Sequence, residues 1–141
     1  MNDGIGNERL KSGHSTWFLV VVALFIATLI ASNIVAVKLI ELSGLVLTAA
    51  IVIFPLSYII GDVLTEVYGY RQARRAIWLG FLGNLVVVVA IVIAGMLPAA
   101  AFWKDQLAFD MILGQTPRIL AASFAAYLVG EFTNSFVLAK L

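Results

Sequence analysis

The chain has 141 residues, of which 62% are hydrophobic and 12% are charged, and its net charge is +1. This composition leaves too little polar surface to cover a soluble globule, so it predicts an integral membrane protein. The basic residues form no patch large enough for nucleic acid, and we expect no nucleic-acid partner. The absence of cysteine and the single histidine, His14, leave no spacing typical of a metal site or of nucleophilic catalysis. We therefore expect no metal, no cofactor and no catalytic residues.

Apolar runs long enough to cross a bilayer dominate the chain. Residues 1–15 are polar and are expected to form a flexible cytoplasmic head. The run 17–37 spans about 30 Å of helix, the thickness of a bilayer core, and it exceeds the apolar stretch of a signal peptide. Three further spans are predicted, at about 45–68, 76–97 and 119–140. The predicted fold of the domain 16–141 is all-α, a polytopic transmembrane helix bundle with four spans.

Two segments between these spans carry their own expectations. The stretch 99–118 is amphipathic, with Trp103, Leu107 and Met111 near helical spacing, and we expect it to lie along the membrane interface. The range 76–97 is almost uniformly apolar, so a residue such as Val88 is expected to face lipid.

The positions of Lys and Arg near the span ends predict the orientation. One side of the membrane would hold Arg9, Lys11, Arg71, Arg74, Arg75 and Lys140. The other side would hold Lys38, Lys104 and Arg118. Because cytoplasmic loops carry the excess of Lys and Arg, the N-terminus is predicted to be cytoplasmic.

One polar pattern occurs twice inside apolar helices, with an offset of 69 residues. It consists of a Tyr, a Gly, an acid and a small polar residue, first as Tyr58, Gly61, Asp62 and Thr65, then as Tyr127, Gly130, Glu131 and Asn134. A carboxylate at the bilayer centre costs roughly 2.5 to 3.5 kcal/mol on insertion scales, so its repetition indicates a functional polar site. The predicted orientation makes the two helices parallel, which places both copies at similar depth.

Helical geometry predicts which of these side chains act together. Tyr127, Glu131 and Asn134 share one face of their helix, as do Tyr58, Asp62 and either Thr65 or Glu66. The two glycines would let a helix or a flat ligand approach the acids. Pro55 is expected to kink the second helix one turn before Tyr58.

A purely structural interpretation remains open for several of these residues. Asp62 and Glu66 could pair with nearby arginines at the cytoplasmic end of their helix. Glu131 lies about 13 Å along the helix from Lys140, and this depth favours a functional role. Asn33 is left open between helix–helix contact and ligand contact, whereas Asn84 is more typical of helix packing.

A longer motif carries a resemblance to a known family. It comprises the stretch 54–70 (FPLSYIIGDVLTEVYGY), the pair Ser32-Asn33 with Lys38, Arg74, and the stretch 130–135 (GEFTNS). These residues resemble the queuosine precursor transporter branch of the vitamin uptake transporter family, and the resemblance covers residues 17–141. It implies a multi-pass bacterial inner-membrane protein that imports 7-cyano-7-deazaguanine or 7-aminomethyl-7-deazaguanine for queuosine in tRNA. The family is similar to a six-helix architecture, so the resemblance implies that this chain is a fragment truncated after the fourth span or a homo-oligomer.

The resemblance also implies roles for the site residues in binding a 7-deazaguanine, which offers N–H donors and the O6 acceptor. Either Glu131 or Asp62 would accept two N–H groups as a bidentate carboxylate. Either Asn134 or Asn33 would donate to O6, and the ring of either Tyr58 or Tyr127 would stack on the ligand. Thr65 and Glu66 complete the predicted substrate site.

Two other classes of function are compatible with parts of this sequence. An enzyme that uses Asp62 and Glu131 as an acid–base pair would need a nucleophile or metal that the sequence does not supply, so we predict that the chain is not an enzyme. The alternative is a substrate-capture component of an energy-coupled vitamin importer with an ATPase partner, since polar sites at mid-membrane serve capture and transport alike.

Overall fold

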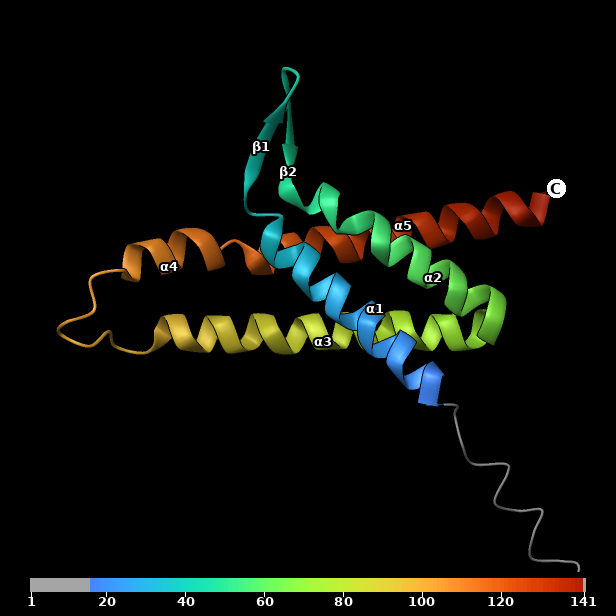
Figure 1. Cartoon of the computed structure of the whole chain (residues 1–141), viewed down its shortest axis with the longest axis horizontal. Helices are drawn as coiled ribbons and strands as arrows, with labels where there is room; N and C mark the ends of the chain where they lie inside the picture. The colour runs from blue at the N-terminus through green and yellow to red at the C-terminus, as the bar shows by residue number, and fades with distance from the viewer. Residues whose placement is uncertain (1–15, 141) are drawn as a thin grey trace, which may run out of the picture.

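The computed structural model describes residues 16–140, and it describes side chains for residues 16–130. The elements in chain order are α1 (Thr16–Val35), β1 (Leu39–Leu42), β2 (Leu45–Thr48), the 3-10 helix η1 (Ala49–Val52), α2 (Phe54–Tyr68), α3 (Tyr70–Met96), α4 (Gln106–Leu113) and α5 (Thr116–Lys140). The long helices pass one another, and the hairpin projects beyond the end of α1 (Figure 1). The predicted transmembrane helix bundle is confirmed, and its described part also contains this hairpin and the 3-10 helix, neither of which was predicted.

Small residues on α3 let α1 pack closely against it. The buried positions of α3 recur every three or four residues: Ala73, Ala76, Gly80, Asn84 and Val88. A Cβ atom on Gly80 would lie 2.6 Å from Cδ1 of Leu29 on α1, so this crossing requires glycine or a shift of that leucine. Such small-residue seams bring helix backbones together in membranes, where lipid supplies no hydrophobic drive for association. Val88 belongs to this packed face, so the expectation that it faces lipid is wrong.

The core lies where α1, α2 and α3 meet. Its buried apolar members are Val22, Phe25, Leu64, Ala73 and Ala76. Gly69, at φ 85°, separates α2 from α3, and this positive φ allows the chain to turn sharply between two helices.

The hairpin occupies part of the range predicted as the second span. Strands β1 and β2 pair antiparallel from Leu39↔Thr48 to Leu42↔Leu45. The two-residue loop holds Ser43 at φ 53° and Gly44 at φ 83°, and positive φ at both positions is the backbone that tight hairpins prefer. The predicted range 45–68 is therefore not one continuous helix, because α2 begins only at Phe54.

Pro55 lies in the first turn of α2, where backbone N–H groups have no partner within the helix, so the N–H that proline lacks is not needed. The expected kink before Tyr58 is therefore wrong, because Pro55 starts the helix and does not interrupt it. The 15 residues of α2 extend over about 22 Å, which is less than a bilayer core.

Three segments of the described chain are long and apolar enough to cross a membrane: Thr16–Val35, Tyr70–Met96 and Gln106–Gly130. They overlap the predicted spans 17–37, 76–97 and 119–140. In the predicted amphipathic stretch Gln106–Leu113 forms a helix and residues 116–118 begin α5, whereas Trp103 lies in a non-helical connection. Leu107 and Met111 are exposed on that helix, as an interfacial position would require.

Candidate functional site

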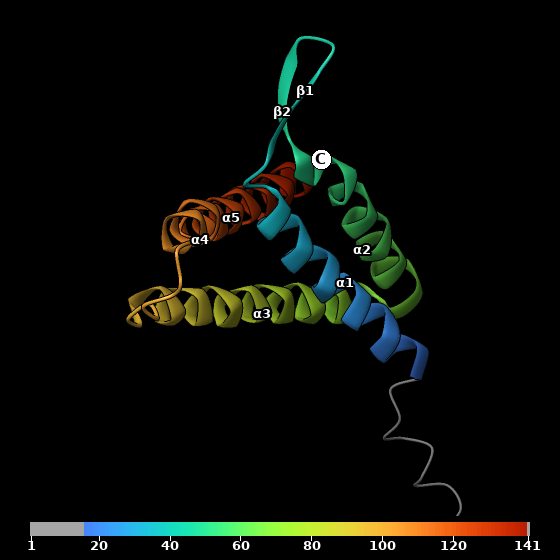
Figure 2. The same cartoon turned by 60° about the vertical axis from the view of Figure 1, so that its left-hand side comes forward.

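A cavity of about 720 Å³ lies between α2 and α5, with α1 and α3 contributing the rest of its wall. Figure 2 shows α2 and α5 apart from one another, with α1 running between them. Five aromatic residues line the cavity: Phe25, Phe54, Tyr58, Phe81 and Tyr127. Five polar residues line it as well: Asn33, Ser57, Asp62, Asn84 and Ser123. This volume and this mixture of rings with a few polar groups are typical of a small-molecule site.

The two copies of the repeated motif meet at this cavity. Helix α2 contributes Tyr58, Gly61 and Asp62, which lie on one face because they are three and four residues apart. Helix α5 contributes Tyr127 and Gly130, the corresponding residues of the second copy. The described parts of both copies therefore line one common space, from opposite helices.

The aromatic residues form two ring clusters, one on each side of the cavity. On α2, the Phe54 and Tyr58 rings meet edge to face with centroids 5.1 Å apart. On the α3–α5 side, the Phe81 ring lies 5.2 Å from that of Tyr127 and 5.1 Å from that of Phe124. Tyr58 is 64% exposed, so its ring is available to a planar ligand.

A chain of hydrogen bonds joins three helices at the cavity wall. Ser123 Oγ on α5 donates to Asn33 Oδ1 on α1 over 3.3 Å. Asn33 Nδ2 donates to Asn84 Oδ1 on α3 over 2.7 Å, and Asn84 Nδ2 donates to the Gly80 carbonyl over 3.0 Å. Asn84 is buried, and this chain satisfies its amide in the membrane interior. Asn33 thus joins helices and also lines the cavity, so both roles left open for it are compatible with its position.

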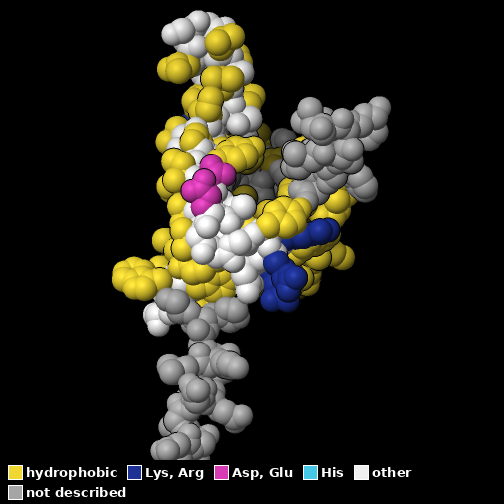
Figure 3. Space-filling model, turned by 90° about the vertical axis from the view of Figure 1, so that its right-hand side faces the viewer, with side chains coloured by type: hydrophobic (Ala, Val, Ile, Leu, Met, Phe, Trp, Pro, Cys, Tyr) yellow, Lys and Arg dark blue, Asp and Glu magenta, His cyan; other side chains and the backbone are white. Residues whose placement is uncertain are grey.

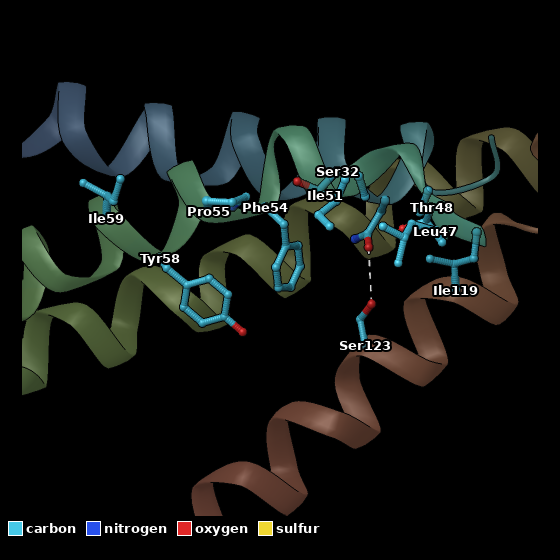
Figure 4. A pocket seen from close by; sticks show the side chains of 13 residues that line it. Ser32, Leu47, Thr48, Ile51, Phe54, Pro55, Tyr58, Ile59, Ile119 and Ser123 are labelled. Atoms are coloured by element: carbon cyan, nitrogen blue, oxygen red, sulfur yellow. Dashed lines mark hydrogen bonds between the residues drawn. The ribbon is translucent and has the colours of Figure 1, made fainter. Parts of the chain in front are cut away.

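A second cavity, of about 580 Å³, adjoins the first on the side of the hairpin. It is lined mainly by apolar residues, among them Leu47 and Ile51, together with Thr48 and Ser32 (Figure 4). Four residues line both cavities: Asn33, Phe54, Tyr58 and Ser123. Figure 4 shows the bond from Ser123 as a dashed line at this shared wall.

The acids of α2 form no ion pair with the arginines of α3 in the part of the chain whose side chains are described. Asp62 and Glu66 are exposed, as are Arg71, Arg74 and Arg75. Figure 3 shows acidic and basic side chains as separate groups on this face. An ion pair with arginine therefore does not explain why an acid occurs at position 62. Asp62 instead lines the cavity.

The remaining predicted site residues differ in position. Thr65 lies one turn beyond Asp62, donates to the Gly61 carbonyl over 2.9 Å, and lines neither cavity. Glu66 does not line either cavity. The side chains of Glu131 and Asn134 lie outside the described residues, although α5 includes their backbone.

The two motif glycines have open space beside them. A Cβ atom on Gly61 would lie 3.6 Å from the Phe25 ring, an ordinary contact, and one on Gly130 would meet nothing within 4 Å. Among the described side chains, neither glycine is therefore required for close helix packing, and the approach of a ligand to them stays a prediction.

Sequence reasoning missed several lining residues. Ser57 and Ser123 carry no pattern of their own, and Phe25 and Phe81 resemble any apolar residue of a membrane helix. Ser57 is buried and donates to the Phe54 carbonyl over 2.7 Å. Helical spacing could have found it, because it lies four residues before Gly61 and so on the same helix face.

Comparison with known proteins gives two matches. Residues 48–141 match the family described as "Putative vitamin uptake transporter". A protein of Bacillus subtilis (strain 168), named "Probable queuosine precursor transporter", is 32% identical over 110 residues, which cover 77% of this chain and 47% of that protein. The match thus spans about half the length of this curated relative. No solved structure matches the chain. With its three apolar segments, the chain is a multi-pass membrane protein of the bacterial inner membrane.

Proposed function

We propose, because this chain belongs to the vitamin uptake transporter family, that it forms a carrier which imports queuosine precursors into the bacterial cell. The favoured ligands are 7-cyano-7-deazaguanine and 7-aminomethyl-7-deazaguanine. The name of the Bacillus subtilis relative supports this ligand class. The observation that carries the proposal is the cavity at which both motif copies meet.

The cavity offers the groups that such a ligand needs. A 7-deazaguanine is flat and presents the N1–H and the exocyclic amine side by side. The Asp62 carboxylate can accept both in a bidentate, charge-assisted pair. The exposed ring of Tyr58 and the ring of Tyr127 can stack on its faces from opposite sides. Glu131 and Asn134, which follow Gly130 on α5, are proposed as further ligand contacts.

The direction of transport depends on the orientation of the chain, which we propose to be cytoplasmic at the N-terminus. The described cations are balanced, with Arg71, Arg74 and Arg75 at one end of the helices and Lys38, Lys104 and Arg118 at the other. The excess comes from Arg9, Lys11 and Lys140, whose side chains lie outside the described residues. In this orientation the hairpin and the smaller cavity lie on the outer side.

Uptake and binding together test this function. The chain is expressed in bacteria that cannot make the precursor, 7-cyano-7-deazaguanine is supplied outside, and queuosine in tRNA is measured. Purified chain in nanodiscs is titrated with the same compound. We expect queuosine in tRNA and saturable binding, both reduced by Asp62→Asn. Absence of both would refute the proposal.

The same two measurements separate a free-standing carrier from a substrate-capture component. Binding together with uptake in cells without an added ATPase supports the carrier that we favour. Binding without uptake, followed by uptake when an ATPase partner is supplied, would favour the capture component. We further propose that the ligand is moved without chemical change. Recovery of 7-cyano-7-deazaguanine with unaltered mass after incubation with purified chain tests this point.

A further inference from the structure

The hydrogen-bond chain at the cavity wall has a fixed direction. Its last acceptor is the Gly80 carbonyl, which has no proton to give, so Asn84 must present Nδ2 to it. Asn84 Oδ1 then faces Asn33, which must present its own Nδ2. Asn33 Oδ1 is left to accept from the Ser123 hydroxyl. The three donors that form these bonds therefore all point away from the cavity end of the chain and toward the α3 backbone.

This direction decides what the wall offers to a ligand. The Ser123 proton is already committed to Asn33, so the free lone pairs at this end are those of Ser123 Oγ and Asn33 Oδ1. The Ser123 bond is the longest of the three, at 3.3 Å, and is the one that a ligand donor can most easily replace. Hydrogen bonds in such a chain strengthen one another, which holds the direction when a ligand arrives.

We propose that Asn33, whose Oδ1 accepts from Ser123 in the free chain, selects ligands that bring an N–H donor to this wall, and that Asn84 is the positioning residue that fixes its direction. This reverses the donor role that the sequence predicted for Asn33. The choice of probe rests on the proposed function. If Asp62 takes the N1–H and one N–H of the exocyclic amine of a 7-deazaguanine, the second amine N–H and the ring N9–H are left, and the ring N9–H is the donor that we propose for Asn33.

The test compares two ligands of the same shape. One is 7-cyano-7-deazaguanine, and the other is its furo analogue, in which an oxygen atom replaces N9–H. In the analogue this ring oxygen, an acceptor, would face Asn33 Oδ1, which is also an acceptor. Titration of the wild-type chain in nanodiscs should give at least tenfold weaker binding of the furo analogue, since a broken hydrogen bond also leaves an unpaired group. Asn33→Leu should reduce this preference to below threefold.

Asn84→Leu separates positioning from contact. Its side chain is proposed to act only through Asn33, so the variant should lose the preference for N–H over oxygen while it still binds both ligands. Ser123→Ala should retain the preference, because Asn33 Oδ1 then accepts directly from the ligand. Thr28→Val is the matched control: Thr28 is buried on α1, donates to the Leu24 carbonyl and lines neither cavity. It should leave the preference unchanged.

A ligand-free measurement keeps the inference testable on its own. In chain labelled with ¹⁵N-asparagine, the side-chain amide protons of Asn33 should exchange slowly with solvent, and Asn84→Leu should make them exchange at least tenfold faster. Unchanged exchange in that variant, or an equal preference in wild type and Asn84→Leu, would overturn the inference. If wild-type chain binds neither ligand, the proposed function fails, and the exchange experiment still decides the direction of the chain.

Discussion

Asp62 gives the sharpest prediction for the proposed site. Its carboxylate borders the large cavity and has no ion-pair partner among the described side chains. Replacement with Asn keeps the shape and one acceptor oxygen, and it removes the charge and the bidentate geometry. A charge-assisted hydrogen bond contributes about 1.5 to 3 kcal/mol, so Asp62→Asn should weaken 7-cyano-7-deazaguanine binding about 10- to 150-fold.

Glu66 provides the matched control for Asp62. It lies on the same helix, one turn further along, and is exposed without lining either cavity. Glu66→Gln removes the same charge at nearly the same depth, so general effects on insertion or on the local field should be shared by both variants. We expect Glu66→Gln to change binding less than twofold.

The assay is calorimetric titration of each variant in nanodiscs, with membrane abundance and thermal unfolding measured in parallel. Queuosine in tRNA from a precursor-deficient strain gives the corresponding cellular measurement. If Asp62→Asn and Glu66→Gln weaken binding equally, the effect comes from membrane charge and not from contact with the ligand. Normal binding by Asp62→Asn at normal abundance would refute the reasoning outright.

Three further predictions concern the walls and the packing of the cavity. Tyr58→Ala should weaken binding roughly 2- to 12-fold by titration and Tyr58→Phe less than twofold, because the ring stacks on the ligand; equal losses would point to the hydroxyl. Gly61→Cys and Ala126→Cys should each react with a small polar thiol reagent and should be protected by the ligand, because both positions line the cavity. Val86→Cys, at an exposed position of α3 that faces lipid, should stay unreactive. Equal labelling at all three positions would contradict a common cavity. Gly80→Ala should unfold more easily than Gly61→Ala in micelles, by at most about 1 kcal/mol, since both gain helix propensity and only the first places its Cβ 2.6 Å from Leu29 Cδ1 and forces that side chain to shift. Equal stability would exclude a cost for that shift.

The long helices were predictable because a bilayer leaves few choices. A lipid-exposed backbone must satisfy its own hydrogen bonds, so apolar runs of sufficient length form helices whatever their detailed sequence. The run 17–37 corresponds to α1 for this reason. The hairpin was missed because a short apolar run is compatible with either a strand or a helix. The pair Ser43-Gly44 was the signal that could have identified it, since both positions need positive φ.

The sequence made it easy to predict that α3 is a helix, but not which of its faces packs against α1. Almost every residue of this helix is apolar, so hydrophobicity cannot distinguish the face that meets lipid from the face that meets α1. Val88 was misassigned on that ground. Residue size carried the missing information, because the small residues Ala76 and Gly80 are buried on this face and Gly80 leaves little room for a Cβ atom beside Leu29 of α1.

The candidate site was predictable where it depends on spacing along one helix. Tyr58 and Asp62 line one cavity as their separation of four residues predicts. The partners of Asn33 are 51 and 90 residues distant in sequence, and no local pattern contains them. The requirement that amides in a membrane find partners could have suggested that Asn33 and Asn84 pair, because they are the two asparagines within the first three apolar runs.

The arrangement of acceptors connects the repeated motif to the hydrogen-bond chain. Asp62 is proposed to accept from the α2 side of the cavity, and Asn33 is proposed to accept from the α1–α5 side. A ligand held by both must carry donors on two of its edges, and a 7-deazaguanine meets that condition with N1–H and the amine on one ring and N9–H on the other. A ligand with donors on one edge only would leave one wall unpaired, at the cost of a buried polar group without a partner. Affinity and selectivity thus depend on opposite walls, which is why substitutions at Asp62 and at Asn84 should change different measurements.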